Sequence, residues 1–413
     1  MQLFGNSEWL ILMTAIIWAC GDKQMEAIKR VRLSEIAELI TKGTTPTTLG
    51  YNFQEDGVNF LKIECFSENG TYIKEKTAHI SEECHEKLKR SKLRTGDILF
   101  SIAGAIGRVA VVTEEMLPAN TNQALAIIRV TRDDIYLPYI KLILTSQIVK
   151  AQFERKKQGV AQLNISLKDI NELEIPLPEK SKQIECASLL EKISGIITAR
   201  QKQLQKLDKL IKARFVELFG DPQRNPHGYK HTKLSDIATY YNGLTYKPEN
   251  VAAEGTIVLR SSNIQNSQLD FADTIRVDCA IKERLMVQKN DILMCSRNGS
   301  AKLVGKVALI KDIQEPMSFG AFMMIIRSHY FGYLMTYFQM DAFRQQIKTS
   351  ATTTINQITG RMLDDVTIPL PPMALVDQFA AFVEQTDKSK AAIQKALDEA
   401  QLLFDSLMQK YFG

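Results

Sequence analysis

The chain has 413 residues, of which 45% are hydrophobic and 24% charged, with 21 Gly and 12 Pro. This composition excludes collagen-like, low-complexity and disordered chains, and the length allows two or three domains. The formal net charge of +5 permits a nucleic-acid partner without indicating one. The six cysteines form no C-x-x-C pair, which argues against a zinc site or a disulfide framework and favours a reducing cytoplasmic location.

An apolar run, Trp9–Cys20, is the unusual feature of the N-terminal segment. A membrane span needs about 20 apolar residues, so this run predicts no membrane crossing. Glu8 precedes it where a secretory signal carries basic residues. A peripheral helix and a leader ahead of a second start at Met25 are the interpretations that remain, and we treat residues 1–27 as an atypical N-terminal extension.

The rest of the chain repeats itself. Lys233–Ala238 (KLSDIA) restates Arg32–Ala37 (RLSEIA), and Ile368–Pro371 (IPLP) restates Ile175–Pro178 (IPLP). Further matched segments follow in the same order, so the chain consists of two copies of one unit, each about 195 residues long. The predicted organisation is a first domain over 28–178, a helical spacer over 179–222, a second domain over 223–371 and a C-terminal helical spacer over 372–413.

Each copy shows the same order of elements. A short amphipathic helix is predicted first, at Leu33–Leu39 and Leu234–Tyr240, followed by short β-branched runs typical of strands. In copy one these runs are Val58–Ile63, Asp97–Ile102, Val109–Val112 and Leu125–Val130; in copy two they are Ile257–Arg260, Asp291–Cys295, Val307–Ile310 and Met323–Arg327. A helical stretch comes next, at Tyr139–Gln158 and Phe331–Lys348, before proline ends the domain.

A long proline-free segment follows each domain, at Ile184–Phe219 and Phe379–Phe412. As one helix the first would be about 54 Å long. Apolar residues recur at heptad spacing in the second segment and hold the same register in the first, where Arg200 and Arg214 interrupt it, which indicates a helix-pairing seam. The predicted seam residues are Ile193, Ile197, Leu204, Leu207, Ile211, Leu218, Ile393, Leu397, Ala400, Phe404, Leu407 and Tyr411. The expected fold is therefore α+β: two similar α/β domains separated by an intramolecular antiparallel coiled coil, in a pseudo-two-fold arrangement. The alternative is two separate helices.

The sequence contains no motif of an enzyme active site. It lacks a phosphate-binding glycine loop and an H-E-x-x-H pair. Asp97 and Asp291 recur between the copies, but an aspartate between a turn and a strand more often caps the turn than acts in catalysis. We therefore expect a recognition protein without catalytic residues or a metal site.

Several motifs together resemble the specificity subunit of type I restriction–modification systems. They are RLSEIA with KGTTP from Lys42, RTGDILFSIAG from Arg94, and IPLPEKSKQI from Ile175, with LFGDP from Leu218. The resemblance covers the chain from about Ile28 to Gly413. It implies two target-recognition domains that each read half of a bipartite site in double-stranded DNA, with the helices setting the spacing.

The resemblance also implies partners and cofactors. Two methyltransferase (modification) subunits dock on the helices, and restriction (translocase-nuclease) subunits complete the complex. No cofactor is expected on this chain, since S-adenosylmethionine, ATP and Mg²⁺ belong to the partner subunits. A stand-alone nuclease or methyltransferase, and a coiled-coil scaffold without DNA binding, are the competing functions.

The two copies differ at the positions expected to meet DNA. Residues from Ser101 in copy one are matched with residues from Ser296 in copy two, and Asn120–Gln123 with Ser318–Ala321. Asn, Gln and Arg pair with adenine and guanine edges, which makes Asn122, Gln123, Arg297 and Asn298 base-reading candidates; capping of turns is an equally weighted alternative. The phosphate-contact candidates are Lys89, Arg90, Lys92, Arg94, Arg108, Lys302 and Lys306.

Overall fold

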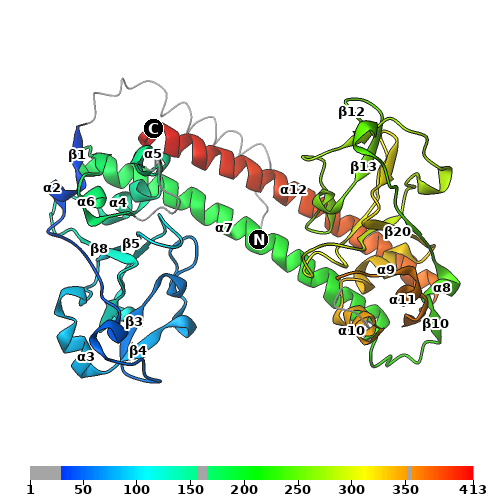
Figure 1. The fold of residues 1–413 in the computed structure, drawn as a ribbon, viewed down its shortest axis with the longest axis horizontal. Coiled ribbons are helices and arrows are strands. Elements are labelled where there is room, and N and C mark those ends of the chain that lie inside the picture. Colours follow the sequence, from blue (N-terminus) through cyan, green and yellow to red (C-terminus); the bar gives the residue numbers. More distant parts are fainter. Residues whose placement is uncertain (1–28, 157–164, 351–355, 413) are drawn as a thin grey trace. The chain divides into compact units, whose positions relative to one another are not determined.

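The computed structural model describes residues 29–156, 165–350 and 356–412, so the N-terminal extension predicted for residues 1–27 lies outside the described residues. The chain forms two compact units. Unit 1 comprises the described residues up to Thr198 together with those from Asp398 onward, and unit 2 comprises those from Ala199 to Leu397. Each unit contains its own sheets (Figure 1). Each also has its own buried clusters of apolar side chains.

Unit 1 has nine strands in three sheets. The strands are β1 (Arg30–Arg32), β2 (Leu39–Lys42), β3 (Val58–Leu61), β4 (Ala78–Ile80), β5 (Ile98–Ser101), β6 (Val109–Val111), β7 (Ala119–Thr121), β8 (Leu125–Arg129) and β9 (Glu174–Pro176). Its short helices are α2 (Leu33–Ile36), α3 (Glu82–Lys87), α4 (Leu137–Leu144), α5 (Gln147–Lys156) and α6 (Leu167–Asn171). The main sheet is antiparallel in the order β2-β8-β5-β6, and the second sheet has the order β4-β3-β7.

Unit 2 repeats this plan. Its strands are β10 (His231–Lys233), β11 (Thr239–Asn242), β12 (Val251–Ala252), β13 (Thr256–Leu259), β14 (Ile264–Gln265), β15 (Gln268–Leu269), β16 (Arg276–Val277), β17 (Ile292–Cys295), β18 (Val307–Leu309), β19 (Met317–Phe319), β20 (Met323–Arg327) and β21 (Thr367–Pro369). Its short helices are α8 (Leu234–Ile237), α9 (Phe331–Tyr337), α10 (Asp341–Ser350) and α11 (Gly360–Asp364). The sheet order β11-β20-β17-β18 corresponds to β2-β8-β5-β6 of unit 1.

The central strands are apolar over most of their length because both of their faces are buried. In β5, Ile98 and Phe100 join one buried cluster, whereas Leu99 joins another on the opposite face. In β17, Ile292 and Leu293 divide in the same way. Successive side chains of a strand point to opposite faces, so a sheet covered on both sides needs a continuous apolar run.

All four predicted domain helices differ in the structure. In copy two, the helix expected at Leu234–Tyr240 ends at Ile237, before β11, and the one expected at Phe331–Lys348 is two helices, α9 and α10. Copy one shows the same two differences. The helix expected at Leu33–Leu39 ends at Ile36, and the following residues form β2, which pairs with β8. Pairing with a buried strand therefore outweighs the helical pattern there. The single helix expected over Tyr139–Gln158 is two helices, because the hydroxyls of Thr145 and Ser146 bond back to the carbonyls of Leu142 and Ile143 and end α4.

The two long helices are α7 (Lys180–Phe219) and α12 (Met373–Phe412), and each contributes one end to each unit. In unit 1 the beginning of α7 packs with the end of α12. In unit 2 the end of α7 packs with the beginning of α12, and Lys390 Nζ lies 2.7 Å from Asp208 Oδ1. The two helices are thus antiparallel within each unit, which confirms the predicted fold class of α/β domains with packed long helices.

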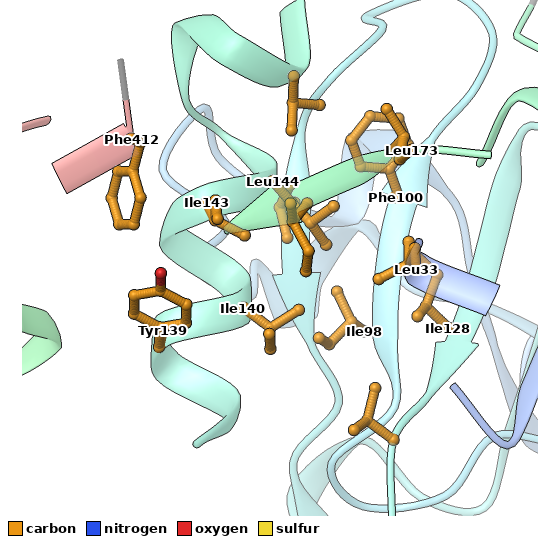
Figure 2. Close-up of a cluster of buried hydrophobic side chains, with 14 of the residues drawn as sticks. Leu33, Ile98, Phe100, Ile128, Tyr139, Ile140, Ile143, Leu144, Leu173 and Phe412 are labelled. Atoms are coloured by element: carbon orange, nitrogen blue, oxygen red, sulfur yellow. The ribbon is translucent and has the colours of Figure 1, made fainter. Parts of the chain in front are cut away.

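The predicted seam residues differ in burial from three other apolar residues of the two long helices. Each of the twelve is buried or half-buried, whereas Leu210, Val216 and Leu402 on the same helices are 48%, 44% and 70% exposed. In unit 1 the last turns of α12 complete the main core. Figure 2 shows Phe412 facing Tyr139 of α4, and their ring centroids are 5.4 Å apart. Phe412 is only 1% exposed, so the end of α12 is an integral part of unit 1.

Candidate nucleic-acid interface

The base-reading candidates of unit 1 come directly after β7, which pairs in parallel with β3. Strand β3 runs parallel to β7, with Leu61 opposite Thr121. The carboxyl ends of parallel strands meet at one edge of a sheet, so Lys62 after β3 and the segment Asn122–Gln123 after β7 lie at that edge. In unit 2, β13 is parallel to β19 and brings Arg260 beside the segment Gly320–Phe322 in the same way. We call this edge the recognition edge of each unit.

The two candidates in unit 1 have different surroundings. Asn122 is half-buried, and its Oδ1 accepts a hydrogen bond from the N–H of Ala124 at 3.1 Å, so it caps a turn. Gln123 is exposed, and its Oε1 accepts a hydrogen bond from the hydroxyl of Thr45. This bond holds the oxygen end of the carboxamide at the surface.

The candidates in unit 2 also divide between fold and surface. Asn298 is half-buried; its Oδ1 accepts from the N–H of Ser300 at 3.0 Å and its Nδ2 donates to Ser261 Oγ at 3.3 Å. Arg297 is exposed, and its guanidinium carbon lies 5.6 Å from the centroid of the Phe322 ring. Asn298 therefore stabilises its own loop, whereas Arg297 presents its donors at the surface.

Equivalent hydrogen bonds correct the matching of the two copies. Ile102 N–H donates to Ala124 O at 2.9 Å, and Ser296 N–H donates to Phe322 O at 3.0 Å. Ser296 thus corresponds to Ile102, and the sequence-based pairing of Ser296 with Ser101 is wrong by one residue. The shared S-x-x-G spacing misled the comparison.

The same hydrogen bonds mark the start of a loop at the recognition edge of each unit. In both units the loop is followed by a glycine with positive φ, Gly107 at 84° and Gly305 at 81°. The loop is Ile102–Ile106 in unit 1 and Ser296–Val304 in unit 2, four residues longer and basic at Arg297 and Lys302. The two units thus share the backbone hydrogen bonds at the base of this loop, whereas the length and charge of the loop differ.

The phosphate candidates are also of two kinds. Lys89, Arg90, Arg94 and Lys302 are exposed, and Lys306 is half-buried. Arg108 donates to the carbonyl of Phe66 at 2.9 Å and to that of Ile63 at 3.4 Å, so it holds a neighbouring segment of unit 1 in place.

Lys92 belongs to a charged cluster on and beside α3. Glu82, His85 and Glu86 place possible metal-ligating atoms within 4.8 Å of one another. Lys92 hydrogen-bonds to Glu86 and lowers the pKa of that carboxyl, and His85 Nδ1 hydrogen-bonds to Asn120. Two of the three groups are thus engaged, and this cluster is better explained by local ion pairing than by a metal.

The recurring aspartates are structural, as predicted. Asp97 accepts a hydrogen bond from the N–H of Arg94 at 2.8 Å, and Asp291 accepts one from the N–H of Gln288 at 2.7 Å. Asp97 pairs with Arg129, and Asp291 pairs with Arg327. Sequence reasoning missed these two pairs, although both arginines also recur between the copies. The hydrogen bonds that Arg129 donates to Asp97 raise the pKa of Arg129.

Lys62 and Arg260 were missed as well. Each follows the last residue of its strand, Leu61 or Leu259, at an equivalent position of the two copies. The ammonium of Lys62 lies 4.4 Å from the centroid of the Phe53 ring, and Arg260 forms a 2.7 Å ion pair with Asp273. A cation recurring directly after the same strand was the available signal.

No helix in the described ranges is both long and apolar enough to cross a membrane. The profile of the type I restriction modification DNA specificity domain matches the chain twice, at residues 25–209 and 226–401. The two matches lie one in each copy of the repeat.

The individual proteins that this chain resembles are specificity subunits of type I restriction enzymes as well. The specificity subunit of the type I restriction enzyme EcoKI from Escherichia coli is 28% identical over 183 residues, which is 41% of this chain and 39% of the relative. The chain thus spans about two fifths of that protein. The MjaIX specificity subunit from Methanocaldococcus jannaschii is 20% identical over 407 residues, 92% of this chain and 91% of the relative. The crystal structure of a type I S subunit from M. genitalium has the same fold, with a TM-score of 0.53 at 16% identity, covering 95% of this chain and 98% of that one.

Proposed function

This chain belongs to the type I restriction modification DNA specificity family, and we propose that it is the DNA-recognition subunit of a type I restriction–modification complex. In this role each unit reads one half of a bipartite site in double-stranded DNA. The observation that carries the proposal is the repetition of one hydrogen-bonded frame with different side chains at its recognition edge. Two related units with different side chains at their recognition edges suit two different half-sites.

Direct readout would come from the exposed candidates at the two recognition edges. The side chains of Gln123 and Arg297 are of the types that pair bidentately with adenine and guanine. Lys89, Arg90, Arg94 and Lys302 are the exposed cations for phosphate contacts, which position a protein on DNA without reading its sequence. Asn122 and Asn298 support the loops that present these groups.

The long helices would fix the spacing between the half-sites. Each has 40 residues without a break, which corresponds to about 60 Å at 1.5 Å per residue. Their exposed apolar residues, among them Leu210, Val216 and Leu402, support docking of modification subunits along the helices. Restriction subunits would join the same complex.

Catalysis would then belong to the partners, which bring S-adenosylmethionine, ATP and Mg²⁺. The five cysteines of the described residues are all free thiols, which agrees with the reducing cytoplasm where such a complex would act.

The decisive experiment is methylome sequencing of the source cells with and without this gene. We expect one bipartite adenine-methylation motif to disappear on deletion and to return on complementation. An unchanged methylome would contradict the proposal. Methylation of DNA by the purified chain with S-adenosylmethionine alone would instead indicate a stand-alone methyltransferase.

A salt titration of DNA binding separates a reader from a scaffold. Phosphate contacts release counterions, so the logarithm of the binding constant should fall linearly with the logarithm of the salt concentration. A coiled-coil scaffold would show no such binding at any salt concentration.

A further inference from the structure

Arg297 and Phe322 form an exposed pair at the recognition edge of unit 2. The guanidinium carbon lies 5.6 Å from the ring centroid. Phe322 is 60% exposed, an unusual position for a phenylalanine, and Arg297 is exposed beside it. Among the described residues no ion pair engages Arg297, whereas Arg260, Arg276 and Arg327 of the same unit each pair with a carboxylate.

The backbone beneath this pair is held by several hydrogen bonds. The carbonyl of Phe322 accepts from the N–H of Ser296 at 3.0 Å, the N–H of Arg297 at 3.1 Å and the hydroxyl of Ser296 at 3.0 Å. Ser296 O in turn accepts from Ile358 N–H at 2.7 Å, and Arg297 forms an isolated β-bridge with Gln357. The two exposed side chains therefore project from a fixed base.

Unit 1 keeps this frame but lacks the pair. The bonds from Ser296 to Phe322 and from Ile358 to Ser296 correspond to those from Ile102 to Ala124, at 2.9 Å, and from Ile165 to Ile102, at 3.1 Å. The residue after Ile102 is Ala103, so two alanines occupy the places of Arg297 and Phe322. Neither arginine nor phenylalanine is needed to build the frame, and their presence in unit 2 calls for a different explanation.

We propose that Arg297, held against the Phe322 ring, reads a guanine in the half-site of unit 2, and that unit 1 reads no base with Ala103 and Ala124. The inference rests on the proposed function. A guanidinium attracted to the face of an aromatic ring is restrained in position while its N–H donors remain available. That fork matches the O6 and N7 acceptors of guanine in the major groove. A phosphate contact would need only the positive charge.

The test measures binding of the full-length chain, in complex with its modification subunits, to its target duplex and to duplexes with one base pair substituted. For the wild type, replacing the guanine that Arg297 reads should weaken binding about 5- to 140-fold, the range for a bidentate contact. In R297A the same base-pair substitution should leave the affinity unchanged, a factor of about 1, while the penalties at every other position remain. F322A should lower the penalty at the same position only, and by less.

Two further variants separate base reading from charge. R297K keeps the charge but not the fork, so it should lose most of the discrimination at this position. K302A, on the same loop, is the matched control and should weaken binding to all duplexes equally. A set of R297A penalties identical to those of the wild type would overturn the inference, as would full rescue by R297K. Loss of the proposed function is distinguishable, because the wild type would then show no penalty at any base pair.

Discussion

Arg129 and Asp97 form a two-pronged ion pair inside unit 1, with Nε–Oδ1 and Nη2–Oδ2 distances of 2.7 Å. Arg129 is 8% exposed and Asp97 1%. Removing the guanidinium leaves a buried carboxylate without its counter-ion, which costs about 3–5 kcal/mol. R129A should lower the free energy of unfolding of unit 1 by that amount, measured by denaturant titration.

Unit 2 and the surface provide the controls. Arg327 forms the same pair with Asp291, but its side chain is 27% exposed, so R327A should cost less than R129A. Arg132 pairs with Asp134 at the surface, where both side chains are about half exposed, and R132A should cost less than about 1 kcal/mol. Equal losses in R129A and R132A would contradict the role assigned to burial.

Phe215 of α7 is predicted to be a key residue of unit 2. It is fully buried, and its ring centroid lies 4.9 Å from that of Phe219, 5.0 Å from Tyr333 and 5.6 Å from Phe379. F215A should destabilise unit 2 by about 3–5 kcal/mol. The neighbouring Val216 is 44% exposed, so V216A should change the free energy of unfolding by no more than about 0.5 kcal/mol. Thermal unfolding of both variants and the wild type measures the two effects. A larger loss for V216A would mean that the helix face is assigned wrongly.

Gly43 leaves no room for a side chain. A Cβ atom there would lie 1.8 Å from the carbonyl oxygen of Thr121 and 2.5 Å from that of Asn122. G43A should therefore displace the recognition edge of unit 1 and weaken DNA binding at least tenfold. Gly195 of α7 has no neighbour within 4 Å of the same position, and G195A should stabilise the helix by up to about 1 kcal/mol. Equal DNA affinity of G43A and wild type would refute the prediction.

Thiol reactivity should follow burial. Burial raises the pKa of Cys186 to about 12, and it also raises the pKa of Cys65, Cys84 and Cys295. The thiolate is the reactive form, so iodoacetamide at pH 8 should modify the half-buried Cys279 ahead of these four. Peptide mass spectrometry of native and denatured protein reads this out; modification of Cys186 as fast as Cys279 would contradict it.

The same shift sets a pH dependence. The pKa of Cys186 is higher in the folded chain than the ordinary value of 9.0. The unfolded state therefore loses the proton first, and stability present below pH 9 is lost as the pH rises towards 12. Wild type should lose more stability than C186S over this range, because serine does not titrate there. Parallel curves would refute the assignment.

The repeated core could be predicted from sequence because its signals are local. Strands such as β5 and β17 are short apolar runs bounded by turns, and the heptad spacing in α7 and α12 predicts which residues face inward. Both follow from the period of the apolar residues alone.

The recognition edge could be predicted only in part. Its geometry depends on the parallel pairing of β3 with β7, which joins segments about 60 residues apart, and no local pattern encodes that. The cation after β3 and β13 can be read from the sequence, but its place beside the segment after β7 or β19 cannot. The loop after Ser296 was misaligned because Ser-x-x-Gly recurs in both loops one residue out of step. Counting from Asp97 and Asp291, like the backbone hydrogen bonds, places Cys295 opposite Ser101.

The position of Phe412 in the core of unit 1 has a consequence for biosynthesis. Unit 2 is continuous in sequence and can be completed as soon as Leu397 has left the ribosome. Unit 1 must wait for the segment from Asp398, about 200 residues after Thr198 was made, which at 5–20 residues per second is roughly 10–40 s. The apolar surface around Tyr139, although translated early, therefore stays open to chaperones until the segment from Asp398 has been made.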